Sequence, residues 1–217
     1  MKKVFISGSI GINKLPHIVE KSLNTIKEKN IAVLIGDAKG VDSLVQDYFS
    51  QNGYLNLNVC SIYEIPRNYK NISFKKSIIK IDIDIKRERI KQEKKDEYMS
   101  LNADYFFVIW NGKSQGSFNN IKRALEYGKL LKIYYTKDNR FLQESEIRDD
   151  IIKKIYEKNN GLTLKELSKY TNLSINSLKG IIQKYKEYYI ESNFRGKINY
   201  KYDIELVDIL KQETLFG

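Results

Sequence analysis

Three glycine-bearing turns follow short apolar runs in the first two-thirds of the sequence, and their residue types suit phosphate binding. Glycines let backbone N–H groups approach an anion, and a helix that starts after such a turn adds the positive end of its dipole. Turns at the carboxyl ends of parallel strands face one crevice. The sequence therefore predicts a phosphate-binding crevice. Its predicted residues are Gly8 and Ser9; Gly36, Asp37, Lys39, Gly40, Asp42 and Ser43; and Gly112, Lys113, Ser114, Gly116, Ser117 and Asn120.

Trp110 stands at the end of the apolar run that precedes the third turn. A tryptophan there is either a core residue or a platform on which a nucleic-acid base stacks, and the sequence leaves both interpretations open. Trp110 is therefore added to the predicted ligand-binding residues.

The three turns can meet in one crevice only if strands and helices alternate along the chain. The pattern of apolar residues predicts such an alternation. Nearly continuous apolar runs predict strands at residues 3–7, 31–35, 57–63, 103–110 and 130–136. Apolar residues at helical spacing predict helices at 15–29, 41–51 and 118–127. This order predicts an α/β class fold, a Rossmann-like parallel sheet with helices on both faces.

The segment 66–102 departs from this pattern and carries most of the excess charge. Ile79, Ile81, Ile83 and Ile85 alternate with polar residues, which predicts a strand, and a charged helix follows, so we interpret the segment as a lid-like insertion. Residues 67–95 contain 11 basic residues and four acidic ones. Such a face attracts nucleotides or nucleic acid, although a merely solvated surface has the same composition.

The last 75 residues predict a winged helix. A helix at 147–157 is followed by Thr163 and Glu166 at capping-box spacing, and then by a helix that Ser174 caps. Two β-like stretches, 188–192 and 197–202, and a last helix at 204–210 complete the order. The predicted domains are 1–140 and 144–217.

The predicted winged helix has local positive charge, with eight basic and three acidic residues between 164 and 201. Hydroxyl, amide and ammonium groups at the start of a recognition helix and at a wing tip meet phosphates and base edges. The predicted DNA-binding residues are Ser174, Asn176, Ser177, Lys179, Arg195 and Lys197. Protein contact is the alternative role of such a module.

Composition narrows the function classes. The 217 residues carry a net charge of +11, with one cysteine, Cys60, and one histidine, His17. Disulfides and cysteine-cluster metal sites are therefore excluded, and neither a metal nor a cofactor is predicted. No apolar run approaches the roughly 20 residues that span a bilayer, and the N-terminus does not have the pattern of a signal peptide. The sequence predicts a cytoplasmic protein without membrane contact.

Two motifs resemble the SLOG superfamily, which includes the DNA-processing protein DprA and the LOG phosphoribohydrolases. The stretch 36–42, Gly-Asp-Ala-Lys-Gly-Val-Asp, is similar to the family's glycine-rich turn. Lys95-Asp96 and Met99, the strand to Trp110 and the turn 112–117 resemble the segment where relatives carry Arg-Asn, a strand and a second glycine turn. The resemblance covers residues 1–136. With the winged helix it implies the DprA branch, whose relatives often dimerise through the Rossmann-like part.

One departure bears on catalysis. The LOG-type enzymes of the superfamily that this sequence resembles cleave the N-glycosidic bond of nucleoside monophosphates. They use an acidic residue that stands three residues after a Thr. Here Ser117 takes the place of that Thr, and Asn120 stands where the acid is expected. An amide cannot act as the carboxylate, which argues against this hydrolysis and leaves no catalytic residue assigned. Asp37 or Asp42 could supply a carboxylate from another loop, although Asp42 also suits a helix start.

Three hypotheses follow. The preferred one is a DprA-like binding protein for nucleotide or nucleic acid, with single-stranded DNA favoured and a homodimer through the Rossmann-like domain as one form. The second is a nucleoside-monophosphate N-glycosidase with an unusual carboxylate. The third is a nucleotide-sensing transcription regulator, in which a ligand in the crevice biases the winged helix.

Overall fold

The computed structural model describes residues 1–194 and 197–216, and it divides into two compact units. The first unit is Met1–Asp149 and the second begins at Asp150. The first unit is longer than the predicted domain 1–140. Arg140–Phe141 forms a short strand on the edge of the sheet, and Arg140 makes an ion pair of 2.7 Å with Glu146. These contacts keep residues 140–146, at the boundary between the two predicted domains, within the first unit.

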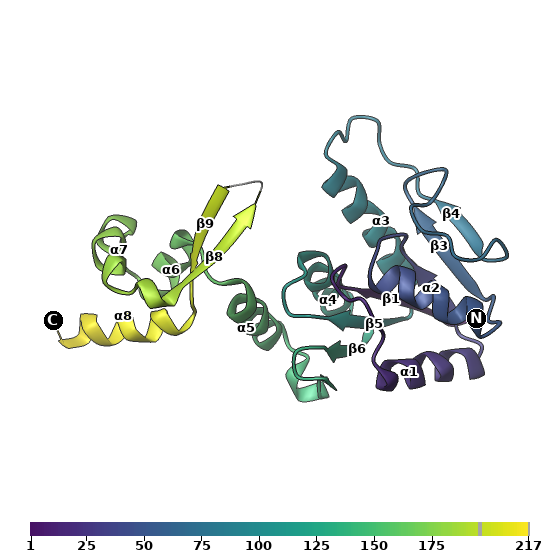
Figure 1. Cartoon of the computed structure of the whole chain (residues 1–217), viewed down its shortest axis with the longest axis horizontal. Helices are drawn as coiled ribbons and strands as arrows, with labels where there is room; N and C mark the ends of the chain where they lie inside the picture. Colours follow the sequence, from purple (N-terminus) through teal and green to yellow (C-terminus); the bar gives the residue numbers. More distant parts are fainter. Residues whose placement is uncertain (195–196, 217) are drawn as a thin grey trace. The chain divides into compact units, whose positions relative to one another are not determined.

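A seven-stranded sheet forms the centre of the first unit, in the order β4-β3-β2-β1-β5-β6-β7 (Figure 1). Every neighbouring pair is parallel except β6 and β7, which are antiparallel. The order reverses between β1 and β5, where ligand crevices open in such sheets. The strands are β1 (Lys3–Gly8), β2 (Ala32–Ile35), β3 (Leu57–Ser61), β4 (Lys75–Ile78), β5 (Tyr105–Trp110), β6 (Leu130–Tyr135) and β7 (Arg140–Phe141).

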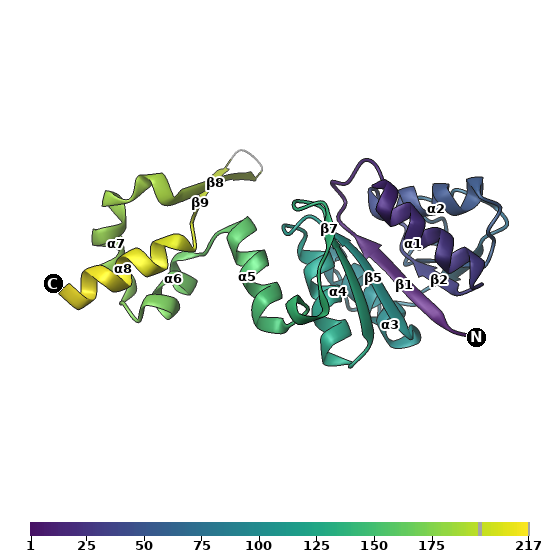
Figure 2. The same ribbon diagram turned by 90° about the horizontal axis from the view of Figure 1, so that it is seen from below.

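Helices cover both faces of this sheet, which confirms the predicted Rossmann-like α/β class (Figure 2). The alternation of side chains along β1 separates the two layers. Val4 and Ile6 pack with the helices α1 and α2, while Phe5 packs with Met99 of α3 and Ala124 of α4. The helices are α1 (His17–Glu28), α2 (Val41–Gln51), α3 (Glu88–Asn102) and α4 (Gln115–Glu126).

The strand predicted from the alternating isoleucines at 79–85 was wrong. The edge strand β4 ends at Ile78, whose partner in β3 is Ser61, the last residue of that strand. The Ile79 amide still donates a 2.8 Å hydrogen bond to the Ser61 carbonyl, but β3 does not continue beside residues 80–87. These residues are irregular apart from a turn at 83–84, in which Ile83 is exposed. The predicted helix that follows exists as α3.

The second unit is a helix-turn-helix with a hairpin, as the predicted winged helix requires. Thr163 and Glu166 form the predicted capping box, and Asn172 takes a left-handed conformation with φ of 59° in the turn between the two central helices. Leu162, Leu167 and Leu178 belong to a core of its own. Its elements are α5 (Asp149–Asn160), α6 (Leu164–Thr171), α7 (Ile175–Ile181), β8 (Tyr189–Phe194), β9 (Lys197–Tyr202) and α8 (Glu205–Phe216). Among the described residues, no helix is long and apolar enough to cross a membrane.

Candidate functional site

A cavity of about 280 Å³ opens at the carboxyl ends of β1 and β5, at the point where the strand order reverses. The end of β1, the turn before α2, one side of α3 and the first turn of α4 supply its walls. Its polar lining residues are Ser7, Asp42, Arg67, Arg89, Gln92, Glu93, Lys95, Asp96, Ser114, Gln115, Ser117, Asn119 and Asn120. A cavity thus lies at the edge of the sheet where the sequence predicts a crevice, with α3 as an additional wall.

Asp37 is a fully buried carboxylate that binds Arg67 and Lys95, two residues of the cavity wall. Arg67 donates to both of its oxygens, at 2.8 and 3.2 Å from the guanidinium, and Ser61 donates at 2.9 Å. Lys95 Nζ lies 3.2 Å from Oδ1. Burial acts to raise the pKa of Asp37, but the Arg67 hydrogen bonds and the Lys95 charge hold it well below its usual value. Asp37 is thus a permanent anion whose hydrogen-bonding capacity is taken up by the protein.

Asp42 is a second buried carboxyl group, and its environment is different. It lies in the first turn of α2 and accepts one hydrogen bond of 3.1 Å from the Ala38 amide. Burial raises the pKa of Asp42 to about 7, although the Lys95 ammonium and the Ala38 amide act in the opposite direction. The close approach of Asp42 requires glycine at position 36, because a Cβ there would lie 3.1 Å from Lys95 Nζ and collide with Asp42 Oδ2. Asp42 can therefore hold or release a proton near neutral pH.

Asp96 brings a third carboxyl group next to Asn120. The Asn120 amide nitrogen lies 3.4 Å from Asp96 Oδ2, and its oxygen accepts a 2.7 Å hydrogen bond from Arg123. Burial raises the pKa of Asp96, against the charges of Lys95 and Arg123 and the hydrogen bond from Asn120. The side chain is 22% exposed and lines the cavity, so it can reach a ligand. The amide at position 120 is thus accompanied by a carboxylate from the neighbouring helix.

Two features of the cavity favour an anionic, hydrogen-bonding ligand. The first is the start of α4, where Ser114 caps the helix, Gly116 and Ser117 line the cavity, and the positive end of the helix dipole favours an anion. The second is Ser7, which is 5% exposed and whose hydroxyl has no hydrogen-bond partner among the described residues. A buried hydroxyl without a partner costs about 1–3 kcal/mol. A ligand oxygen in the cavity would supply that partner.

The structure divides the predicted ligand-binding residues into two groups. Those that line the cavity are Gly8, Asp42, Ser114, Gly116, Ser117 and Asn120. Those that do not line it are Ser9, Gly36, Asp37, Lys39, Gly40, Ser43, Trp110, Gly112 and Lys113. Ser9 belongs to the second group because its hydroxyl connects two turns, donating to Asn111 Oδ1 at 2.9 Å and accepting from the Asn111 amide at 3.1 Å.

Trp110 has a structural role. Its side chain is completely buried, packs against Phe118 and Tyr135, and donates a 3.3 Å hydrogen bond to the carbonyl of Ser114. Of the two interpretations that the sequence left open, the structure places Trp110 in the core. Its hydrogen bond stabilises the turn before α4, and its buried ring has no face on which a base could stack.

The sequence predicted that the basic segment 67–95 attracts nucleotides or nucleic acid, but it did not name the α3 side chains that line the cavity. Arg89, Gln92, Glu93 and Lys95 line the cavity from this helix, and Arg67 reaches it from the loop after β3. One signal was present, because Lys95-Asp96 lies in a stretch with family resemblance. Its charged neighbours, however, have the spacing of an ordinary solvated helix.

Four of the predicted DNA-binding residues of the second unit are exposed at the start of α7 and along it. Asn176, Ser177 and Lys179 are exposed on α7, while Leu178 between them is buried in the core. Ser174 caps this helix by accepting a 3.1 Å hydrogen bond from the Ser177 amide. Arg195 lies outside the described residues, as does the side chain of Lys197 at the start of β9.

Comparison with known families found a match that lies almost entirely in the second unit. Residues 144–201 match the model of the helix-turn-helix domain of the M protein trans-acting positive regulator (MGA). The match covers the two central helices and most of the hairpin. A comparison with curated proteins found no match.

Among solved structures, the chain matches DNA processing protein A from Helicobacter pylori, a protein described as binding single-stranded DNA in a unique mode. The two sequences are 17% identical, and the TM-score is 0.44. The match covers 61% of this chain and 64% of that protein, so it spans less than two-thirds of the other chain.

Proposed function

We propose that this chain is a nucleic-acid-binding protein whose cavity between β1, α3 and α4 holds one phosphate-bearing nucleotide unit. The observation that carries the proposal is the buried Ser7 hydroxyl, which has no partner among the described residues and lines a cavity that the start of α4 also borders. A volume of about 280 Å³ is near the lower end of small-ligand cavities, which suits one nucleotide unit better than a longer segment.

Charge around the opening supports an anionic ligand. The side chain of Arg89 is 71% exposed at the cavity and makes only a surface ion pair of 3.1 Å with Glu93. Arg89 can therefore turn to a phosphate at little cost, because exposed ion pairs contribute about 0–1 kcal/mol. The buried pair of Asp37 and Lys95 behind it stays intact. Single-stranded DNA is the favoured partner, since its terminal or unstacked units can enter such a cavity.

The second unit supplies the other half of the proposal. Its exposed α7 residues Asn176, Ser177 and Lys179 form the surface that a recognition helix presents to the major groove. The matched family takes its name from a trans-acting positive regulator, which supports a DNA-binding role for this module. The same match favours a variant of the proposal in which a nucleotide in the cavity regulates duplex binding.

The N-glycosidase remains the alternative, favoured by one observation. Asp42, with a pKa of about 7, and Asp96, next to Asn120, both line the cavity. A carboxyl group that titrates near neutral pH can donate a proton to a leaving base, and a second carboxylate can stabilise the sugar cation. Release of free base from a nucleoside monophosphate, lost on Asp96→Asn, would establish this activity.

Fluorescence anisotropy with labelled single-stranded and duplex DNA at two salt concentrations tests the main proposal. We expect Ser7→Ala and Arg89→Gln to weaken single-strand binding, and Arg89→Gln to lower the salt slope by about one phosphate contact. Lys179→Gln should weaken duplex binding instead. The control is Lys21→Gln, which removes one exposed charge from α1, away from the cavity lining. Absence of binding to both forms of DNA would refute the proposal, and binding of a free nucleotide alone would favour the regulator or the enzyme.

A further inference from the structure

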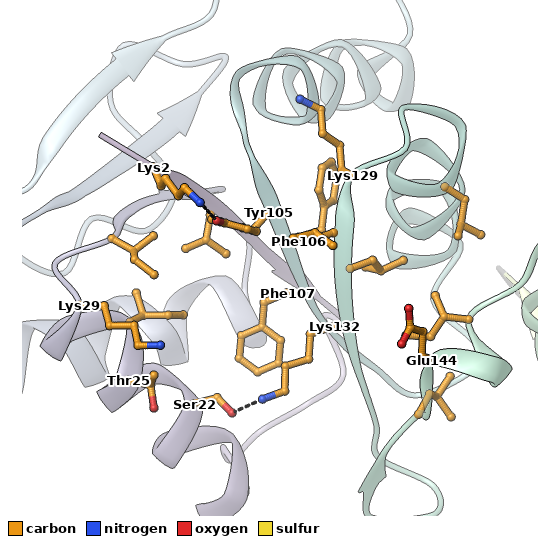
Figure 3. A pocket seen from close by; sticks show the side chains of 18 of the residues that line it. Lys2, Ser22, Thr25, Lys29, Tyr105, Phe106, Phe107, Lys129, Lys132 and Glu144 are labelled. Carbon is orange, nitrogen blue, oxygen red and sulfur yellow. Dashed lines mark hydrogen bonds between the residues drawn. The ribbon is translucent and has the colours of Figure 1, made fainter.

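A second and larger cavity lies at the opposite edge of the same sheet, where β1, β5 and β6 begin (Figure 3). Its volume is about 1110 Å³, which is room for a small organic molecule. The end of α1, the residues after α4 and a segment after β7 complete its walls. None of the residues that line the first cavity lines this one.

The floor of this cavity is apolar and partly aromatic. Phe107 and Ile26 are buried members of the core beneath it, and Tyr105 lies beside them. Leu130 at its edge is 69% exposed, although leucine is a residue that proteins usually bury. The apolar floor of a cavity of this size suits a ligand that brings an apolar surface of its own.

The charged groups around the floor are almost all cations. Lys2, Lys29, Lys129 and Lys132 line the cavity, whereas Glu144 is the one carboxylate in its described lining. Figure 3 shows Lys29 and Lys132 on the side of Phe107, and Glu144 on the far side of β6. Lys2 donates a hydrogen bond to the Tyr105 hydroxyl and lies near Asp104, which is outside the lining. The side of the cavity next to Phe107 is therefore positively charged.

Lys132 is placed to meet an anion over this floor. Its ammonium lies 4.1 Å from the centre of the Phe141 ring and donates a 3.0 Å hydrogen bond to the Ser22 hydroxyl. Burial lowers the pKa of Lys132. No carboxylate among the described residues pairs with it, in contrast to Lys95. A partly desolvated cation without a counterion is stabilised by an anionic ligand.

We propose that this cavity binds a small amphipathic organic anion, a carboxylate or sulfonate with an apolar body. The apolar body lies on Phe107, Ile26 and Leu130, and the anionic group meets Lys132. The combination of charge and apolar floor selects this class. A phosphate backbone alone would need no apolar floor, and a neutral apolar ligand would need no cluster of lysines. The inference is independent of the proposed function because the two cavities share no lining residue.

Titration of the full chain with anilinonaphthalenesulfonate, an aromatic sulfonate whose fluorescence rises in apolar sites, tests the proposal. We expect saturable binding and displacement by decanoate, but not by decanol or acetate, which lack the anionic group and the apolar body respectively. Lys132→Gln should weaken binding about tenfold, the scale of one charge-assisted hydrogen bond. Leu130→Gln should weaken it as well, and its exposed position leaves folding unaffected.

Lys21→Gln is the matched control, because it removes one charge from α1 outside the lining and should leave affinity unchanged. Circular dichroism shows that each variant is folded, which separates loss of the site from loss of structure. Equal binding to the Lys132→Gln variant, or displacement by decanol as effective as by decanoate, would overturn the proposal. Displacement by adenosine monophosphate but not by decanoate would also overturn it. An aromatic carboxylate used beside decanoate distinguishes aryl from aliphatic ligands within the proposed class.

Discussion

The two ends of the parallel sheet provide opposite environments for a lysine side chain. At the carboxyl ends of the strands, Lys95 is 3% exposed and makes ion pairs with Asp37 at 3.2 Å and with Asp96 at 3.9 Å. At the opposite edge, Lys132 lies over aromatic rings and has no carboxylate partner among the described residues. The protein balances charge internally at the first end, so the fold depends on these groups. At the second end the cations are left for solvent or a ligand.

The largest effect that this comparison predicts follows from removing Asp37. The Asp37→Ala variant leaves Lys95 buried without its main partner and Arg67 without its carboxylate acceptor. Loss of one member of a buried pair costs about 3–5 kcal/mol, and we expect the free energy of unfolding to fall by that amount. Urea denaturation measures it.

The matched control is Asp47→Ala, because Asp47 pairs with Lys70 at 3.2 Å on the surface. Exposed pairs contribute about 0–1 kcal/mol, so this variant should remain close to the unsubstituted chain. Equal falls in the free energy of unfolding of the two variants would show that the buried ion pairs of Asp37 stabilise the fold no more than an exposed pair does.

The pH dependence of stability gives the second prediction. The pKa of Asp42 is raised to about 7 in the folded state, above its value in the unfolded chain. Between pH of about 4 and 7 the unfolded state therefore binds fewer protons, and the free energy of unfolding falls as pH rises. Asp42→Asn removes this proton. We expect the stability of the variant relative to the unsubstituted chain to increase across that window, by at most about 1.4 kcal/mol per pH unit.

Denaturation at several pH values between 4.5 and 8 checks this expectation. Asp37 does not obscure it, because its lowered pKa causes loss of stability only as pH falls below the usual carboxyl range. A constant difference between the two proteins across the window would mean that Asp42 is ionised throughout.

The sheet, its helices and the winged helix could be predicted from the sequence, because apolar periodicity and capping residues are local signals. Val4 and Phe5 alternate between two helical layers as the apolar run implies, and Thr163 and Glu166 form the expected capping box. The false strand at 79–85 shows the limit of such signals, since alternation specifies a strand only where a neighbour can pair with it.

Of the residues predicted for the site, Gly8, Gly116 and Asp42 line the cavity, whereas Gly36, Gly40 and Gly112 do not, and the side chains of α3 were not named. Gly8 and Gly116 line the cavity as expected because the ends of parallel strands meet at one edge. Ion pairs over long sequence separation, such as Asp37 with Lys95, leave no periodic trace in a sequence. The unpartnered hydroxyl of Ser7 depends on every neighbour that packs around it, and so it emerges only in three dimensions.

Substitutions at two glycines of the candidate site test ligand binding and stability separately. A Cβ at Gly8 would lie 2.5 Å from both the Ile109 oxygen and Val41 Cγ2, so Gly8→Ala should cost about 1–3 kcal/mol. A Cβ at Gly116 meets nothing within 4 Å and projects from the first turn of α4. The free energy of unfolding of the Gly116→Ala variant should therefore stay the same or rise by up to about 1 kcal/mol. The same substitution should weaken ligand binding at the cavity. Thermal unfolding with and without a nucleotide distinguishes the two, and unchanged ligand stabilisation in the Gly116→Ala variant would place the ligand elsewhere.

The smallest effect is expected at Lys132, and it tests the comparison most directly. Lys132→Met removes a cation over the Phe141 ring and one hydrogen bond to Ser22, and such exposed cation–π contacts contribute about 0.5–1 kcal/mol. Methionine also keeps an apolar side chain over the same rings, so we expect the free energy of unfolding to change by less than about 1 kcal/mol. The same substitution at Lys95 leaves Asp37, Asp42 and Asp96 together without their shared cation, and it should cost several times more. Urea denaturation of the two variants side by side measures the difference. Similar losses would mean that Lys132 is as much a part of the fold as Lys95, and that its edge of the sheet is not kept available for a ligand.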